Sequence, residues 1–215
     1  MHDEIVEAIK QGDVSRVRSL SHEDKTVIHA GSMSLVLLSV YMKQPDITQA
    51  LLETGVNLTL HTATACGDAM RVSTIVREQP DRVNKHRSDS FHPLGLATYF
   101  GHVDVVDALL DVGANVNLHS SNTQHVTALH SAVSARHDDI IDRLLQWGAD
   151  ANAAEQGGIT RLMQAAHQDD IDLVRKLLRY GADAAMTSTD GKRVLDYTSD
   201  IHATGVMTLL EQTLP

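Results

Sequence analysis

The chain is poor in cysteine and in basic charge. Its 215 residues include one cysteine, Cys66, so no disulfide can form within the chain. Nothing in this cysteine usage points to an oxidising compartment. Acidic residues outnumber basic ones by 28 to 18, and the formal net charge is −10. Because this charge does not attract phosphate backbones or anionic lipid, we expect a cytoplasmic protein that binds no nucleic acid.

Long apolar runs are also missing. No stretch approaches the ~20 apolar residues that a helix needs to cross a bilayer. The start, MHDEIVEAIKQGD, carries acidic residues where a signal peptide has basic ones. We therefore expect no membrane attachment. Aromatic residues make up only 3% of the chain, as two Phe, four Tyr and one Trp, so the positions of these few side chains are informative.

What the chain does contain is an internal repeat. Three stretches align, starting at residues 91, 126 and 159 with FHPLGLATYFGHVDVV, VTALHSAVSARHDDII and ITRLMQAAHQDDIDLV. Each stretch continues to a leucine pair and then to a glycine, which is Gly113, Gly148 or Gly181. These glycines are 35 and 33 residues apart. A period of this length is typical of helical solenoids.

Each copy is expected to form two short helices and a turn. Thr127 and Thr160 stand where a hydroxyl can cap the first helix, and Pro93 stands at a first-turn position that tolerates proline. Adjacent apolar pairs four residues apart predict an amphipathic second helix. The closing glycine suits the left-handed conformation that ends a helix. One such unit cannot bury its own apolar face, so neighbouring units must stack.

Two of the copies carry a recognisable signature. Residues 127–132 read TALHSA, residues 92–97 read HPLGLA, and the tails after the glycines read GANVN and GADAN. These patterns resemble the ankyrin signature T-P-L-H-x-A and the ankyrin hairpin segment, so the chain is similar to the ankyrin-repeat family. The resemblance implies an all-α ankyrin-repeat solenoid of about seven stacked helix-turn-helix units with short β-hairpin loops. It also implies a noncatalytic scaffold or adaptor that binds a protein partner.

The weaker copies extend the resemblance to a single array over residues 1–215. The predicted parts are an N-terminal cap at 1–30, repeats at 31–57, 58–86, 87–121, 122–154 and 155–187, and a C-terminal cap at 188–215. The repeat at 58–86 follows Gly55 so closely that its hairpin is expected to be shortened or missing. This order of units is similar to that of short bacterial ankyrin-repeat proteins.

The resemblance implies that a partner lies in the concave groove, which the ends of the first helices and the hairpin tips line. The residues expected there are Tyr41, Met42, Phe91, Tyr99, Phe100, Val126, Ser134, Ile159 and His167. Aromatic residues are frequent among the energetically dominant residues of interfaces. Tyr41 and Phe100 could instead pack beneath the next unit. We expect Trp147 and Tyr180, which precede closing glycines, to pack at helix ends rather than to bind a partner.

Patterns that carry catalysis or metal binding are missing from the sequence. The 13 histidines form no H-E-x-x-H or Cys/His ligand motif, and no nucleophile elbow or phosphate-binding glycine loop occurs. We expect no metal, no cofactor and no enzymatic activity, and we expect Cys66 to be a small packed side chain. By the resemblance, His130 is expected to hydrogen-bond within its turn. His86, His92, His119 and His125 could gather at the hairpins, but surface histidines are the expected reading.

Two alternative functions stay open at this point. The chain could be a self-associating structural module, because VMTLLEQTLP near its end is apolar, or a regulatory subunit of an enzyme. We expect a monomer rather than a homo-oligomer. An enzyme would need a pocket with several converging ionisable groups, whereas a binding scaffold needs only an exposed complementary surface.

Overall fold

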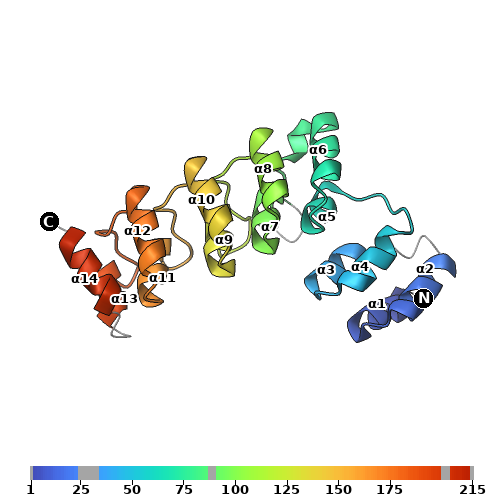
Figure 1. The fold of residues 1–215 in the computed structure, drawn as a ribbon, viewed down its shortest axis with the longest axis horizontal. Helices are drawn as coiled ribbons and strands as arrows, with labels where there is room; N and C mark the ends of the chain where they lie inside the picture. The colour runs from blue at the N-terminus through green and yellow to red at the C-terminus, as the bar shows by residue number, and fades with distance from the viewer. Residues whose placement is uncertain (1, 24–33, 87–90, 200–203, 214–215) are drawn as a thin grey trace. The chain divides into compact units, whose positions relative to one another are not determined.

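The computed structural model describes residues 2–23, 34–86, 91–199 and 204–213 (Figure 1). Within these ranges the regular structure is helical, without an extended strand, which confirms the predicted all-α fold. The elements are α1 (His2–Gln11), α2 (Val14–Glu23), α3 (Leu35–Tyr41), α4 (Pro45–Leu52), α5 (Leu60–Ala65), α6 (Ala69–Glu78), the short 3-10 helix η2 (Pro80–Arg82), α7 (Pro93–Phe100), α8 (Val103–Asp111), α9 (Ala128–Ala135), α10 (Asp138–Gln146), α11 (Arg161–His167), α12 (Ile171–Arg179), α13 (Val194–Ser199) and α14 (Thr204–Thr213).

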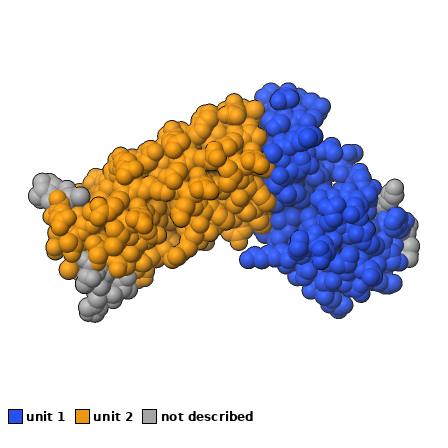
Figure 2. Space-filling model, in the orientation of Figure 1, with its two compact units in different colours: residues 1–82 blue, residues 83–215 orange. Residues whose placement is uncertain are grey.

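The chain divides into two compact units, Met1–Arg82 and Val83–Pro215 (Figure 2). The first unit contains α1 to α6, and the second contains α7 to α14. Within each unit the odd-numbered, inner helices of successive pairs pack on one another, as α1 does on α3 and α7 on α9. The even-numbered, outer helices also pack on one another, as α2 does on α4 and α8 on α10. The finer division into two caps and five repeats stays a prediction.

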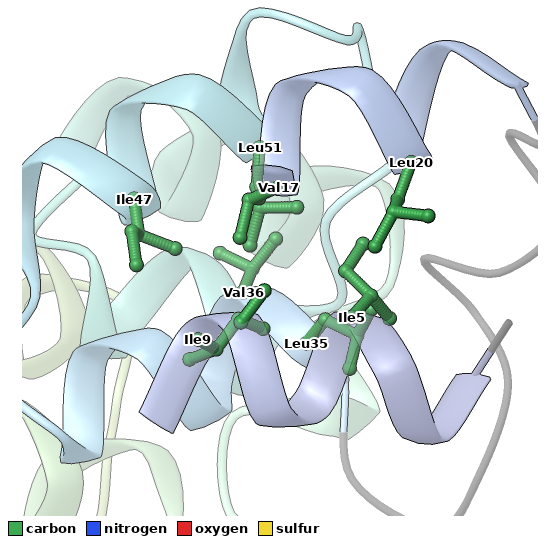
Figure 3. Packing of buried hydrophobic residues seen from close by; sticks show 9 residues of the cluster. Ile5, Ile9, Val17, Leu20, Leu35, Val36, Ile47 and Leu51 are labelled. Atoms are coloured by element: carbon green, nitrogen blue, oxygen red, sulfur yellow. The ribbon is translucent and has the colours of Figure 1, made fainter. Parts of the chain in front are cut away.

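Apolar side chains from α1 to α4 meet in the core of the first unit. The labelled members in Figure 3 are Ile5, Ile9, Val17, Leu20, Leu35, Val36, Ile47 and Leu51. All of them are buried. Burying one such side chain contributes about 1.5–3 kcal/mol relative to leaving it exposed. Because no single helix pair could cover these side chains, the first unit depends on the stacking of its pairs.

The inner helices α7, α9 and α11 begin at side-chain caps. The Thr127 hydroxyl accepts a hydrogen bond from the backbone N–H of His130, and the Thr160 hydroxyl accepts one from that of Met163. Both predicted threonine caps are therefore confirmed. In α7 the cap is His92, whose ring Nδ1 accepts from the backbone N–H of Gly95 at 3.2 Å. These caps satisfy donors that the first turn of a helix otherwise leaves without partners.

The outer helices α8, α10 and α12 are each followed, after one capping residue, by a left-handed glycine. Gly113, Gly148 and Gly181 have φ values of 88°, 84° and 88°. A residue with a Cβ rarely adopts this backbone conformation, which explains why glycine closes each helix. The prediction made from the repeated glycine is confirmed.

Asparagine side chains link each repeat of the second unit to the next. Asn117 donates from Nδ2 to the Gly148 carbonyl at 3.1 Å, and its Oδ1 accepts from the Asp150 N–H at 2.8 Å. Asn152 makes the same two bonds one repeat further on, at 2.9 and 2.7 Å. Asn84 makes them one repeat earlier, at 3.5 and 2.8 Å. This asparagine ladder fixes the spacing of successive repeats because each side chain bonds two backbone groups of its neighbour.

Ion pairs form a second ladder along the outer helices. Arg143 of α10 lies 2.8 Å from the Asp107 carboxylate of α8, and Lys176 of α12 lies 2.8 Å from Asp142 of α10. Partly exposed pairs of this kind contribute little individually. Their repetition nevertheless fixes which outer helix faces which, because a shift by one turn would separate both pairs.

The connections between pairs differ in length along the chain. Residues 112–127 join α8 to α9 and residues 147–160 join α10 to α11, but only residues 53–59 join α4 to α5. This confirms the shortened connection that the position of Gly55 predicts. The longer connections turn back as hairpins, with isolated antiparallel bridges between Ala154 and Thr160 and between Thr187 and Arg193.

Candidate partner-binding face

The most exposed aromatic side chain on the predicted binding face is Tyr99. Its side chain, at the end of α7, is 53% exposed, and its ring meets that of Phe100 edge to face at 5.1 Å. Phe100 is half-buried and also stacks on the His102 ring at 6.1 Å. The Tyr99 carbonyl lies 3.3 Å from His137 Nε2 of the next repeat. The Phe100 contact supports the Tyr99 ring, and about half of the residue stays exposed.

Ser134 and His167 end α9 and α11 at positions equivalent to Tyr99, and both are exposed. Phe91, Val126 and Ile159 are half-buried and directly precede the helix caps of α7, α9 and α11. Of the helix-end residues predicted for this face, Tyr99, Ser134 and His167 are exposed, whereas Tyr41, Met42 and Phe100 are half-buried. The sequence alone does not show that Phe91, Val126 and Ile159 are half-buried and not fully exposed.

A hollow of about 300 Å³ lies on this face between α11, α13 and the hairpin before α11. Its lining includes Ile159 and His167, as expected, and also Met163, Gln164 and Tyr197. Sequence reasoning did not predict Met163 or Tyr197 as part of this face. The available signal was the alignment of GKRVLDY with GITRLMQ, which places Tyr197 one repeat after Gln164.

Neighbouring hairpin tips are joined through their backbones. The Gln156 N–H donates to the Gln124 carbonyl at 3.3 Å, and the Thr189 N–H donates to the Gly157 carbonyl at 2.8 Å. Because each tip bonds the next, the hairpins form one continuous edge beside the inner helices. Such an edge presents its side chains in a fixed order.

Tyr41 and Met42, the two remaining predicted residues, belong to the first unit. Both are half-buried, and Met42 packs against the core cluster of Figure 3. Cys66 packs against the same cluster. Burial, with a smaller effect of Asp68, raises the pKa of the Cys66 thiol to about 11. At neutral pH the thiol is therefore protonated and a poor nucleophile, which agrees with a packing role for this cysteine.

Comparison with protein-family models identifies this architecture. A model of three ankyrin repeats matches residues 60–155, and a single ankyrin-repeat model matches residues 157–189. The chain belongs to the ankyrin-repeat family. It is also 30% identical over 111 residues to alpha-latrocrustotoxin-Lt1a of Latrodectus tredecimguttatus, a match that covers 52% of this chain and 8% of the toxin. Ankyrin repeats are generally noncatalytic protein-interaction modules.

The signature histidine of the ankyrin repeat at α9 is buried in its own turn. His130 Nδ1 accepts from the Thr127 N–H at 3.1 Å and lies 2.6 Å from the Thr127 hydroxyl. This confirms the structural role that the resemblance implies. Burial, together with the nearby Arg161 and His119, lowers the pKa of His130 to about 3. The ring is therefore neutral under physiological conditions.

The next ankyrin repeat carries a buried cation where its neighbour has alanine. The Arg161 side chain is 2% exposed, and its Nη2 lies 2.8 Å from Oε1 of Glu155, whose side chain is 33% exposed. Arg161 Nη1 also donates to Gln164. Burial lowers the pKa of Arg161, and Glu155 partly opposes this shift. Glu155 and Gln164 also line the 300 Å³ hollow, so the carboxylate at this rim is already paired with a cation beneath it.

The hairpin histidines come together only in part. His86 Nε2 lies 2.7 Å from the His119 carbonyl, and the His86 ring meets the buried His92 ring edge to face at 5.8 Å. His125 is exposed. In the described ranges no cluster of three histidine, cysteine or carboxylate side chains is suited to hold a metal ion. No described helix is long and apolar enough to span a bilayer.

Two aromatic residues depart from the sequence-based expectation. Trp147 and Tyr180 were expected to pack at the ends of outer helices, but their side chains are 50% and 38% exposed. Each residue is the cap that follows its helix, immediately before a left-handed glycine. These two side chains therefore present apolar surface outside the predicted groove.

Proposed function

We propose that this ankyrin-repeat protein is a noncatalytic scaffold that holds a protein partner on the inner-helix face of its second unit. The observation that carries the proposal is the exposed Tyr99 ring, which is held against Phe100 at the end of α7. In a chain with 3% aromatic residues, an exposed tyrosine at this position is a strong candidate for an interface anchor.

The rest of the face supports the same function. His167, Ile159 and Tyr197 surround a hollow that is large enough to admit one partner side chain, and the hairpin tips form a hydrogen-bonded edge beside it. A surface that is fixed before binding loses little conformational freedom when a partner docks. We expect the partner to touch both the Tyr99 end and the His167 end of the face.

The test is affinity capture from a lysate of the source cell, followed by binding measurements with each captured protein. The variants are Tyr99→Ala, His167→Ala and, as a matched control, Met70→Ala. Among the described residues of the first unit, Met70 is the most exposed large apolar one, at 82%. We expect Tyr99→Ala to weaken binding at least tenfold, His167→Ala to weaken it less, and Met70→Ala to leave it unchanged.

Circular dichroism of each variant provides the folding control. If folded Tyr99→Ala and His167→Ala proteins keep every partner at wild-type affinity, the partner does not bind this face and the proposal is wrong. If Tyr99→Ala unfolds, Tyr99→Phe replaces it, because phenylalanine keeps the contact with Phe100 and removes only the hydroxyl at the surface.

A further inference from the structure

A second apolar surface lies at the ends of the outer helices. Val112, Trp147 and Tyr180 occupy the capping position after α8, α10 and α12, and their exposed fractions are 41%, 50% and 38%. The same position is thus apolar and exposed in three successive repeats. We call these three residues the outer apolar row. It contains the only tryptophan of the chain and one of its four tyrosines.

The outer apolar row stands on a rigid support. Each of its residues precedes a left-handed glycine, and the carbonyls of those glycines accept hydrogen bonds from the asparagine ladder. The ion pair between Lys176 and Asp142 holds α12 against α10, and α10 packs on α8 (Figure 1). The spacing of the three side chains is therefore set before any partner arrives, which lowers the entropic cost of binding.

The exposed charged residues within three positions of the outer apolar row are mostly negative, and the basic residues one turn earlier, Arg143 and Lys176, are paired with Asp107 and Asp142. Asp111, Asp150 and Asp183 are exposed, each within three residues of a member of the row, and Arg179 is the exposed basic residue next to Tyr180. Asp111 is the last residue of α8, where a carboxylate is disfavoured by the negative end of the helix dipole. An incoming cation near Asp111 would relieve that unfavourable interaction.

We propose that the outer apolar row binds a segment of a partner protein that combines apolar side chains with lysine or arginine. The apolar side chains cover Trp147 and its two neighbours in the row, and the cations face Asp111 and Asp150. Because Arg179 repels cations near Tyr180, the basic residues of the segment lie toward the Val112 end. This surface uses the ends of outer helices, so it is separate from the face proposed above, which uses the ends of inner helices.

The experiment selects ligands from a random peptide library displayed on phage, with the full chain as bait. Peptides are first depleted on the Trp147→Ala protein and then enriched on the wild type. We expect the enriched peptides to carry a net positive charge together with aromatic or aliphatic residues. Since Trp147 is the only tryptophan, a bound peptide should shift its fluorescence emission to shorter wavelength as the indole leaves water.

Fluorescently labelled copies of the enriched peptides then measure affinity. Trp147→Ala and Tyr180→Ala should each weaken binding at least tenfold, while Trp147→Phe should retain most of it. Asp111→Asn and Asp150→Asn should weaken binding a few-fold at low salt, and this effect should fade at high salt. Tyr99→Ala, on the inner-helix face, should leave affinity for these peptides unchanged.

Three results would overturn the proposal. The first is that no peptide is enriched on the wild type over Trp147→Ala, with both proteins folded by circular dichroism. The second is enrichment of acidic peptides, or of peptides without apolar residues. The third is self-association of the wild type in sedimentation that Trp147→Ala abolishes, which would show that a second copy of the chain covers the row.

Discussion

The starts of α9 and α11 have the same backbone design but different buried chemistry. Both helices begin at a threonine cap, Thr127 or Thr160, followed by a residue buried at the first helical position. In α9 that residue is Ala128, and the third helical residue is the neutral His130. In α11 it is Arg161, and its charge is balanced by Glu155. The threonine cap sets the helix start in both repeats. The buried residue after the cap can change from alanine to arginine only if a counter-ion such as Glu155 is present as well.

The first prediction tests this matched set through the removal of Glu155. Glu155→Ala should lower the free energy of unfolding by about 2–4 kcal/mol, because it leaves the buried guanidinium of Arg161 without its counter-ion. The double variant Glu155→Ala/Arg161→Ala, which places alanine where α9 has Ala128, should recover most of that loss. Urea unfolding followed by circular dichroism and by Trp147 fluorescence measures both. If Glu155→Ala alone leaves stability unchanged, the buried Arg161 does not depend on Glu155 as its counter-ion.

The second prediction concerns the asparagine ladder, which the two repeats share. Asn117→Ala and Asn152→Ala should each reduce stability by about 1–2 kcal/mol, because each loses two hydrogen bonds to backbone groups of the next repeat. The losses should be equal within experimental error, unlike those at the helix starts. Asn57→Ala, at an exposed position of the short connection after α4, is the control and should have little effect. A clear inequality between Asn117 and Asn152 would mean that the ladder is not uniform.

The third prediction replaces the buried histidine of α9 with the residue found at the same position of α11. The variant is His130→Met, because Met163 is the third residue of α11. At pH 7 the variant should be less stable by about 1 kcal/mol, because it loses the hydrogen bonds between His130 and Thr127. The pKa of His130 falls from 6.5 to about 3 on folding, so the unfolded state binds more protons between these values. The wild type should therefore lose stability relative to the variant as the pH falls below 6.5.

Thermal unfolding from pH 7 to pH 4 measures this difference. The stability advantage of the wild type over His130→Met should shrink as the pH falls and then change sign, because the variant lacks the titrating ring. Parallel stability profiles would show that His130 is protonated to the same extent in the folded and unfolded states, contrary to its burial.

The sequence predicts the fold well because the fold depends on local, repeated signals. The caps at Thr127 and Thr160, the closing glycines and the paired apolar residues each specify one feature of a helix pair, and each recurs at a fixed spacing. The period alone was enough to place the exposed Tyr99 at the end of an inner helix. The shortened connection after α4 also follows directly from the position of Gly55.

The features that were missed depend on contacts that no local pattern in the sequence specifies. Tyr197 joins Ile159 and His167 at one hollow only because successive repeats stack, and its own repeat matches the pattern weakly. Trp147 was assigned to packing because of its position at the end of an outer helix, but half of it is exposed. The sequence analysis assigned no role to Arg161 and did not identify its buried pair with Glu155.

The asparagine ladder also bears on how such a chain can lengthen. Asn117 and Asn152 recognise only backbone groups of the following repeat, and those groups are created by the glycine turn that every such repeat carries. An extra copy of the segment from one threonine cap to the next would therefore find suitable partners on both sides. Duplication of a repeat would extend the surface available to partners while leaving the existing joints unaltered. The asparagine hydrogen bonds between repeats would therefore be duplicated together with the repeat, whatever partner that repeat binds.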